Sequence, residues 1–166
     1  PIRSALRASP VDVCERARSY RPDIVFGADI IAGFPTETEE MFGNTLKIVE
    51  ECDLTFLHVF PYSARPGTPA ARMPQVPGDV RRARAARLRE AGARQMGRFL
   101  KLHVKQSRQV IVEKDNLGPT EHFAQVRLDK NVTAGHLISV WTTGLEGETL
   151  LGEVRGGDEL HAELLR

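Results

Sequence analysis

Residues 11–104 alternate between helix-like and strand-like patterns of hydrophobic and polar positions. Residues 11–20 repeat apolar positions at helical spacing. This helix is expected to end before Pro22, because proline disfavours helix in the residue that precedes it. Residues 23–33 and 54–63 are mostly apolar runs of strand length, which is typical of strands buried on both faces of a parallel sheet.

The segments that follow each of these strands predict two further helices. Residues 37–52 place apolar side chains along one helical face, and a long helical pattern runs from Asp79 to about Val104. Strands that alternate with helices indicate βαβ units on a parallel sheet. Two strands cannot form a stable sheet of this kind alone, so we expect further strands from residues that precede Pro1.

After about residue 104 the pattern changes to short runs that partly alternate between apolar and polar positions. Strands are predicted at residues 107–114, 122–128, 136–142 and 148–154, with turn-rich stretches such as "DNLGPT" and "TGLEG" between them. Even spacing of short strands predicts a small antiparallel barrel or sandwich. The sequence therefore predicts an α/β domain over residues 1–104 and a small all-β domain over residues 105–166. The second domain ends in an acidic stretch, which is compatible with a short helix or with a frayed tail.

Composition adds few constraints. The chain has 166 residues, 41% of them hydrophobic and 27% charged, with a formal net charge of +1. No apolar run approaches the ~18–20 residues of a membrane span, and the first ten residues lack an apolar signal core, so a cytoplasmic protein without a membrane partner is expected. Cys14 and Cys52 are too few for a metal site. A disulfide between them is one alternative, but we expect two buried free thiols.

The segment "ADIIAGFPTETEE" places three glutamates directly after a predicted strand. Thr36 and Glu39 have the spacing of a capping box, and carboxylates in a first helical turn are stabilised by the helix dipole. Gly33 is compatible with two roles. It can serve a sharp structural turn, or it can let a ligand approach the main chain at the carboxyl end of a parallel strand.

The loops after the two strands, "GFPTET" and "PYSARPGTP", should open side by side on one edge of the sheet. Arg65 in the second loop is a candidate anion or ligand contact, flanked by Tyr62 and Ser63, although a solvated arginine fits equally. His58 lies inside an apolar strand, where a hydrogen-bonded core histidine competes with a catalytic one.

The helix from Asp79 is the most basic part of the chain. An arginine-rich helix can present a merely solvated face, or it can steer a polyanion such as RNA. Its arginines are Arg81, Arg82, Arg84, Arg87, Arg89, Arg94 and Arg98.

Two motifs in this order, "DIIAGFPTETEEMF" and "LHVFPYSARPGTPAARMP", resemble the radical S-adenosylmethionine methylthiotransferases. Within this family, the segments "HVFPYS" and "GTPAARMP" most resemble those of the tRNA enzymes that act on threonylcarbamoyladenosine next to the anticodon. The resemblance implies the last βα units of an open radical SAM barrel, a partial TIM barrel, followed by a TRAM domain, an OB-like β-barrel. "RQVIVEK" and "GPTEHFAQVRL" look like the first TRAM strands, although the usual glycine before the barrel is absent.

The resemblance also implies S-adenosyl-L-methionine and two [4Fe–4S] clusters in the whole enzyme. Cluster ligation requires cysteine thiolates, and the two cysteines here match no cluster spacing, so the ligands lie outside this chain. We therefore expect no catalytic and no metal-binding residue here, and a fragment that is inactive without the N-terminal part of the same enzyme. By position in the family motifs, the expected cofactor contacts are Asp29, Ile31, Gly33, Phe60 and Tyr62.

The implied partner is tRNA. Phe123 could stack on a base and Arg127 could meet a phosphate, although Phe123 equally fits a barrel core. The expected substrate or RNA contacts are Arg65, Arg108, Lys114, Phe123 and Arg127. Two alternatives stay open: a non-catalytic RNA-binding module of a tRNA-modifying system, and a fragment of a related methylthiotransferase acting on isopentenyladenosine or a ribosomal protein.

Overall fold

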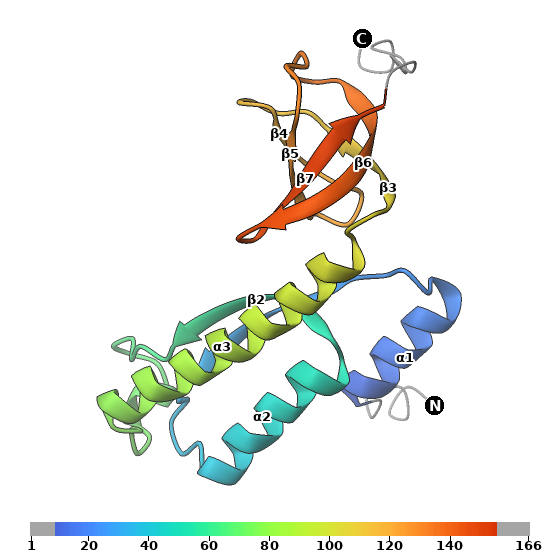
Figure 1. Cartoon of the computed structure of the whole chain (residues 1–166). Helices are drawn as coiled ribbons and strands as arrows, with labels where there is room; N and C mark the ends of the chain where they lie inside the picture. The colour runs from blue at the N-terminus through green and yellow to red at the C-terminus, as the bar shows by residue number, and fades with distance from the viewer. Residues whose placement is uncertain (1–8, 156–166) are drawn as a thin grey trace. The chain divides into compact units, whose positions relative to one another are not determined.

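The computed structural model describes residues 9–155, and the chain divides into two compact units at Met96 and Gly97 (Figure 1). The division falls inside helix α3 (Gly78–Leu102). The domains inferred above, 1–104 and 105–166, stay a prediction. The helix or tail expected at the end of the chain lies outside the described residues.

The first unit has the predicted order of helices and strands. It contains α1 (Pro10–Tyr20), β1 (Phe26–Ala32), α2 (Glu39–Glu51), β2 (Leu54–Pro61), the short 3₁₀ helix η2 (Ala70–Arg72) and most of α3. β1 and β2 pair in parallel, with Ile31 opposite Phe60. The prediction of parallel strands joined by a helix is confirmed.

One face of the β1–β2 pair packs against the helices. Ala28 and Ile30 of β1 and Leu57 of β2 pack on a core that includes Phe42 of α2 and Leu88 of α3, both fully buried. The opposite face is open in the described structure. There Ile31 is 54% exposed and Phe60 is 53% exposed, so the prediction of strands buried on both faces is wrong for this structure.

Helix α2 begins two residues later than its predicted capping box. Thr38 is the N-cap, and its hydroxyl accepts a hydrogen bond from the N–H of Met41 at 3.2 Å. Thr36 instead has a positive φ of 68° in the preceding turn. The Thr36–Glu39 capping box is therefore wrong, because the residues before Thr38 belong to a turn with contacts of its own.

The two cysteines are free and buried, as predicted. Cys14 of α1 and Cys52, which ends α2, belong to the same hydrophobic core. Burial raises the pKa of Cys52 to about 11, and a hydrogen bond with Cys14 acts in the same direction. Both thiols are therefore shielded, and their reactivity reports whether this core is closed.

The second unit is a curled five-stranded sheet in the order β3–β6–β7–β5–β4 (Figure 1). Four of its strands match predicted ones: β3 (Ser107–Ile111), β5 (Gln125–Leu128), β6 (Leu137–Glu146) and β7 (Thr149–Val154). An additional bridge pairs Val110 of β3 with Thr120. The sheet therefore curls until its two edge strands approach each other.

Two details of this sheet differ from the prediction. β4 (Leu117–Pro119) was expected to be a turn, because Gly and Pro usually interrupt strands. Gly118 is required there, since a Cβ atom would lie 2.0 Å from the carbonyl oxygen of Ile111. In addition, β5 and β7 pair in parallel, so the expectation of a purely antiparallel barrel is wrong.

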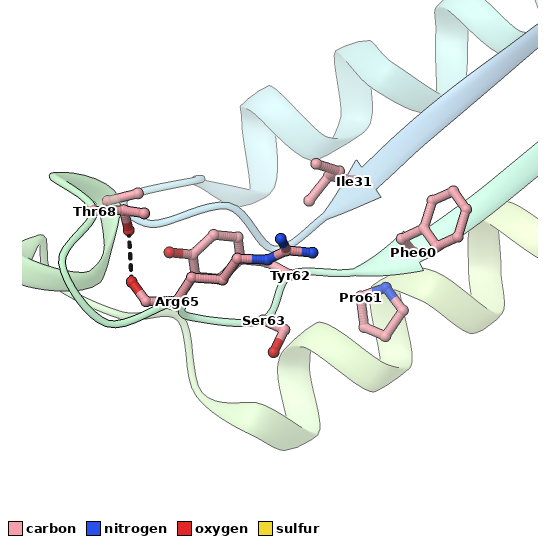
Figure 2. Close-up of a pocket in the computed structure, with 8 residues that line it drawn as sticks. Ile31, Phe60, Pro61, Tyr62, Ser63, Arg65 and Thr68 are labelled. Carbon is pink, nitrogen blue, oxygen red and sulfur yellow. Dashed lines mark hydrogen bonds between the residues drawn. The ribbon is translucent and has the colours of Figure 1, made fainter.

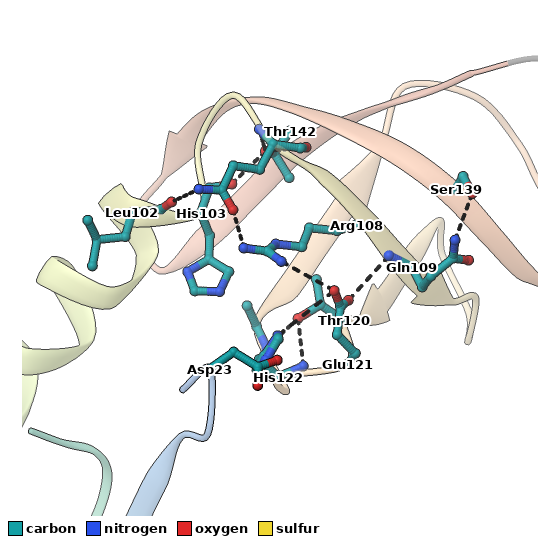
Figure 3. A network of polar contacts seen from close by, with 12 residues as sticks. Asp23, Leu102, His103, Arg108, Gln109, Thr120, Glu121, His122, Ser139 and Thr142 are labelled. Carbon is teal, nitrogen blue, oxygen red and sulfur yellow. Dashed lines mark hydrogen bonds and ion pairs between the residues drawn. The ribbon is translucent and has the colours of Figure 1, made fainter. Parts of the chain in front are cut away.

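A polar cluster built around two buried histidines, His103 and His122, lies beside this sheet (Figure 3). The Nδ1 atom of His103 lies 2.8 Å from the carbonyl oxygen of Phe99 and therefore carries the proton that bridges them. The ring of His122 meets His103 edge-on at 5.6 Å between centroids, and the Arg108 guanidinium pairs with the Glu121 carboxylate at 3.3 Å. Burial lowers the pKa of His103, and the charge of Arg108 acts in the same direction.

Acid should therefore destabilise the second unit. The pKa of His103 is lower in the folded chain than in the unfolded chain, and the unfolded value is about 6.5. Neutral His103 contributes fully to the free energy of unfolding at pH values above the unfolded pKa. This contribution is lost as the pH falls through the folded pKa, with a slope of at most about 1.4 kcal/mol per pH unit. The single tryptophan, Trp141, lies in β6, so its fluorescence during urea unfolding reports this unit.

We expect a lower urea midpoint at about pH 5 than at about pH 7.5. The difference should shrink in His103→Gln, and it should persist in His136→Gln, which alters a histidine outside the cluster. An unchanged pH dependence in His103→Gln would contradict this assignment.

Candidate functional site

The ends of β1 and β2 emerge side by side. Ala32 lies opposite Pro61 in the ladder, and the N–H of Tyr62 donates to the Ala32 carbonyl oxygen at 2.8 Å, one step beyond the strands. The prediction that both exits open at one edge of the sheet is confirmed. The segments that follow, residues 33–38 and 62–77, therefore start from adjacent positions.

The turn after β1 is shaped by Gly33 and closed by Glu37. Gly33 has φ 73°, and a Cβ atom at this position would lie 2.4 Å from Cγ of Arg81. Its N–H donates to Oε2 of Glu37 at 2.9 Å. Contacts within the protein thus account for the glycine as a structural turn, and its N–H is already occupied by a carboxylate.

A buried ion pair holds this turn against α3. Nη1 of Arg84 lies 2.7 Å from Oε2 of Glu37 and also donates to the Glu37 carbonyl oxygen at 2.9 Å. The two side chains are only 7% and 12% exposed. Glu37 therefore links the backbone of Gly33 to helix α3, a role unlike the helix-starting role that its position suggested.

The neighbouring glutamate extends the same network at the surface. Glu39 lies 3.3 Å from Arg84 and 2.6 Å from Arg87. Hydrogen bonding to Arg87 is the main cause that lowers the pKa of Glu39. The Arg87 guanidinium lies over the ring of buried Phe42, 4.6 Å from its centroid. Glu39 and Arg87 thus cover the start of α2.

Two further arginines of α3 bind the end of β2. Arg81 donates to the carbonyl oxygen of Tyr62 at 2.7 Å, and Arg89 donates to that of Val59 at 3.2 Å. Together with Arg84 and Arg87, they hold the turns at this edge of the sheet against the arginine-rich helix. Sequence reasoning missed this role, although Arg81, Arg84, Leu88 and Gln95 share the helical stripe that faces the core.

A pocket of about 500 Å³ opens at the strand ends (Figure 2). Ile31 and Phe60 supply apolar surface, Tyr62 packs edge-on against Phe34 at 5.4 Å, and Arg65 lies on the following loop. The Tyr62 hydroxyl is buried and has no hydrogen-bond partner in the part of the chain that the structure describes. The pocket is lined by Ile31, Phe60, Pro61, Tyr62, Ser63, Arg65, Thr68 and Ala70.

The structure thus brings four of the predicted site residues together: Ile31, Phe60, Tyr62 and Arg65. Asp29 lies two residues before Ile31 on the same open face, whereas Gly33 is buried in the turn. The apolar walls, the unsatisfied hydroxyl and the nearby guanidinium suit a flat, partly polar ligand such as a nucleoside.

The predicted RNA contacts in the second unit lie in different surroundings. Arg108 is engaged by Glu121 and Arg127 by Glu146. Lys114 is exposed in the turn before β4. Phe123 is 73% exposed, so the alternative that it forms part of the barrel core is wrong.

The described structure contains neither a cluster of metal ligands nor a membrane-spanning helix. Within residues 9–155, no three His, Cys, Asp or Glu side chains gather in a way that could hold a metal ion. Across the same residues, no helix combines the length and the apolar character that a membrane crossing requires.

Comparison with known proteins relates the chain to a family. No family model matches the chain. Over 140 residues, 84% of the chain and 33% of the relative, it is 50% identical to the threonylcarbamoyladenosine tRNA methylthiotransferase MtaB of Rickettsia prowazekii. The chain belongs to the methylthiotransferase family. The resemblance inferred from the two motifs is thereby confirmed.

Other relatives carry the name of a different enzyme. The chain is 37% identical over 159 residues to the tRNA-2-methylthio-N(6)-dimethylallyladenosine synthase of Erythrobacter litoralis, covering 92% of the chain and 36% of the relative. It is 37% identical over 149 residues to that of Cereibacter sphaeroides, covering 86% and 34%. The chain spans about a third of the length of the relatives that it matches.

Breaking the buried ion pair should open the first unit of the chain. Arg84→Met leaves the Glu37 carboxylate buried without its partner, a change that costs about 3–5 kcal/mol in comparable sites. Cys14 and Cys52 then become accessible more often, so a thiol reagent such as DTNB should react at least about tenfold faster.

The double variant Arg84→Met with Glu37→Gln should recover part of this loss, because no unpaired charge remains. Arg82→Met, which changes an exposed arginine of the same helix, is the matched control and should leave the labelling rate unchanged. Equal labelling rates in Arg84→Met and Arg82→Met would rule out the stabilising role of the pair.

Proposed function

We propose that this chain is the C-terminal part of a radical SAM tRNA methylthiotransferase that modifies C2 of N6-threonylcarbamoyladenosine next to the anticodon. The observation that carries the proposal is the pocket at two adjacent parallel strand ends, in a chain 50% identical to a threonylcarbamoyladenosine tRNA methylthiotransferase. Over long alignments the identity is 50% to the threonylcarbamoyladenosine enzyme and 37% to the dimethylallyladenosine synthase of Erythrobacter litoralis, which supports the threonylcarbamoyl substrate. By itself the chain is expected to be inactive.

The pocket fits the adenosyl part of S-adenosyl-L-methionine, the proposed cofactor. Phe60 and Ile31 offer apolar surface for a purine. The buried Tyr62 hydroxyl has no partner among residues 9–155, and a bound ligand could supply one. Asp29, on the same open face, can accept hydrogen bonds from ribose hydroxyls. When bound, this cofactor supplies the one-electron chemistry that a methylthiotransferase needs. The part of this chain is to hold and orient it.

The two [4Fe–4S] clusters proposed for the whole enzyme do not fit the cysteines of this chain. Cys14 and Cys52 are buried in the hydrophobic core beside each other, and burial raises the pKa of Cys52. A cluster ligand must instead be a thiolate with access to iron. The cluster ligands are therefore assigned to the N-terminal part of the enzyme.

The second unit, which we propose to be a TRAM domain, would hold the tRNA. Phe123 carries a positive φ of 63° in a tight loop, while its neighbours His122 and Ala124 are buried. The Thr120 hydroxyl accepts from both of these neighbours' N–H groups, at 3.2 and 3.1 Å. A strained backbone that projects an aromatic ring into solvent is costly, and it suits a platform on which a nucleobase stacks.

The second unit offers fewer cationic contacts to RNA than the sequence suggested. Its Lys114 is exposed, whereas Arg108 and Arg127 already have carboxylate partners. Arg65, in the first unit, borders the pocket there. RNA binding by this chain should therefore depend on stacking more than on phosphate contacts. The exposed Phe123 equally supports the second candidate, a non-catalytic RNA-binding module.

Nucleoside analysis separates these functions. Deleting the gene and digesting total tRNA for mass spectrometry should remove the methylthio group from threonylcarbamoyladenosine, and the intact gene should restore it. Unchanged nucleosides would overturn the proposed enzyme and favour the binding module. Loss of the methylthio group from isopentenyladenosine instead would keep the family and change the substrate.

A further inference from the structure

A carboxylate and an imidazole lie side by side on the open face of the β1–β2 pair. Asp29 of β1 and His58 of β2 are partners in the parallel ladder, and both are exposed. The intervening positions, Ala28, Ile30 and Val59, pack on the core. His58 is therefore not the hydrogen-bonded core histidine that its apolar strand suggested.

This pair continues the wall of the pocket. Ile31 and Phe60, two residues further along their strands, are also ladder partners, and both line the pocket. Alternate residues of a strand share a face, so all four side chains lie on one surface. The polar pair is about 6–7 Å from the apolar pair along the strands, so a substrate can lie over it beside the adenosyl group proposed for the pocket.

The two side chains have complementary hydrogen-bonding capacity. Neighbouring strands lie about 4.8 Å apart, so the Asp29 carboxylate can accept the N–H of one ring nitrogen of His58. Such a hydrogen bond would fix the ring and leave its second nitrogen available to a ligand. On the other side of Ile31 and Phe60, Arg65 borders the pocket.

We propose that His58, positioned by Asp29, selects the substituent on the substrate purine. It favours one that carries hydroxyl and carboxylate groups over one that is only hydrocarbon. The inference rests on the proposed function and deepens it. A threonylcarbamoyl group offers a ureido group, a hydroxyl and a carboxylate, whereas a dimethylallyl group offers only C–H bonds.

The physical basis is the loss of hydration when a substrate covers the pair. A polar substituent replaces the water on His58 with hydrogen bonds of its own, but a hydrocarbon leaves the imidazole covered and unsatisfied. Sites built to hydrogen-bond a substrate reject analogues without the matching group by large factors. A preference of at least about tenfold is expected from this pair.

The test uses the whole protein that contains this chain, expressed in a bacterium whose own tRNA methylthiotransferases have been deleted. Mass spectrometry then measures the methylthiolated fractions of threonylcarbamoyladenosine and of isopentenyladenosine in one preparation of total tRNA. His58→Leu should lower the first fraction at least about tenfold relative to the second. His58→Gln, which keeps a donor, should retain more of the preference, and His136→Gln in the second unit should change neither fraction.

Asp29 needs a separate readout because it also faces the proposed cofactor. If Asp29 positions His58, Asp29→Ala shifts the ratio of the two products as His58→Leu does, and Asp29→Glu restores it. An equal loss of both products in Asp29→Ala would contradict the positioning role.

An unchanged ratio in His58→Leu, in a protein whose Cys14 and Cys52 stay shielded from DTNB, would overturn the assignment of His58. The unaltered protein is the reference for the proposed function itself. If it methylthiolates neither nucleoside, that function fails and the inference fails with it. If it methylthiolates threonylcarbamoyladenosine and His58→Leu does so with the same selectivity, only the inference fails.

Discussion

The buried ion pair between Glu37 and Arg84 is the contact on which the geometry of the site depends. Glu37 uses one carboxylate oxygen to hold both the N–H of Gly33 and the guanidinium of Arg84. Removing two charges from water offsets much of their attraction, so such a pair specifies position more than it adds stability. Here it fixes the exit of β1, while Arg81 and Arg89 of the same helix fix the end of β2. One helix therefore sets the spacing of both strand ends and the width of the pocket between them.

Much of the fold could be predicted because its elements follow simple periodicities. Apolar runs and helical stripes placed β1, α2, β2 and α3, and four strands of the second unit, close to where they lie. The exposure of Ile31 and Phe60 could not be predicted, because an apolar strand pattern does not say which partners are present. The strand β4 was also missed, since Gly118 and Pro119 satisfy turn rules, and only the approach of Ile111 explains the glycine.

The site shows the same division between local pattern and tertiary contact. That Ile31, Phe60, Tyr62 and Arg65 converge follows from one rule, the common edge of parallel strands. The pairing of Glu37 with Arg84 joins residues 47 positions apart and has no local signature beyond an arginine on an apolar helical stripe. The ion pairs of Arg108 and Arg127 were hidden in the same way, because charge counting does not show which cations already have partners.

Amide hydrogen exchange at Gly33 tests most directly whether this carboxylate bridge organises the site. In the unaltered protein the Gly33 N–H should be protected, and Arg84→Met should speed its exchange by at least about tenfold, because the carboxylate loses its anchor. The amide of Thr142 in the second unit, which donates to the Gln106 carbonyl oxygen, serves as the internal reference. A Gly33 amide that exchanges freely in the unaltered protein, or one that Arg84→Met leaves as protected as before, would contradict the account.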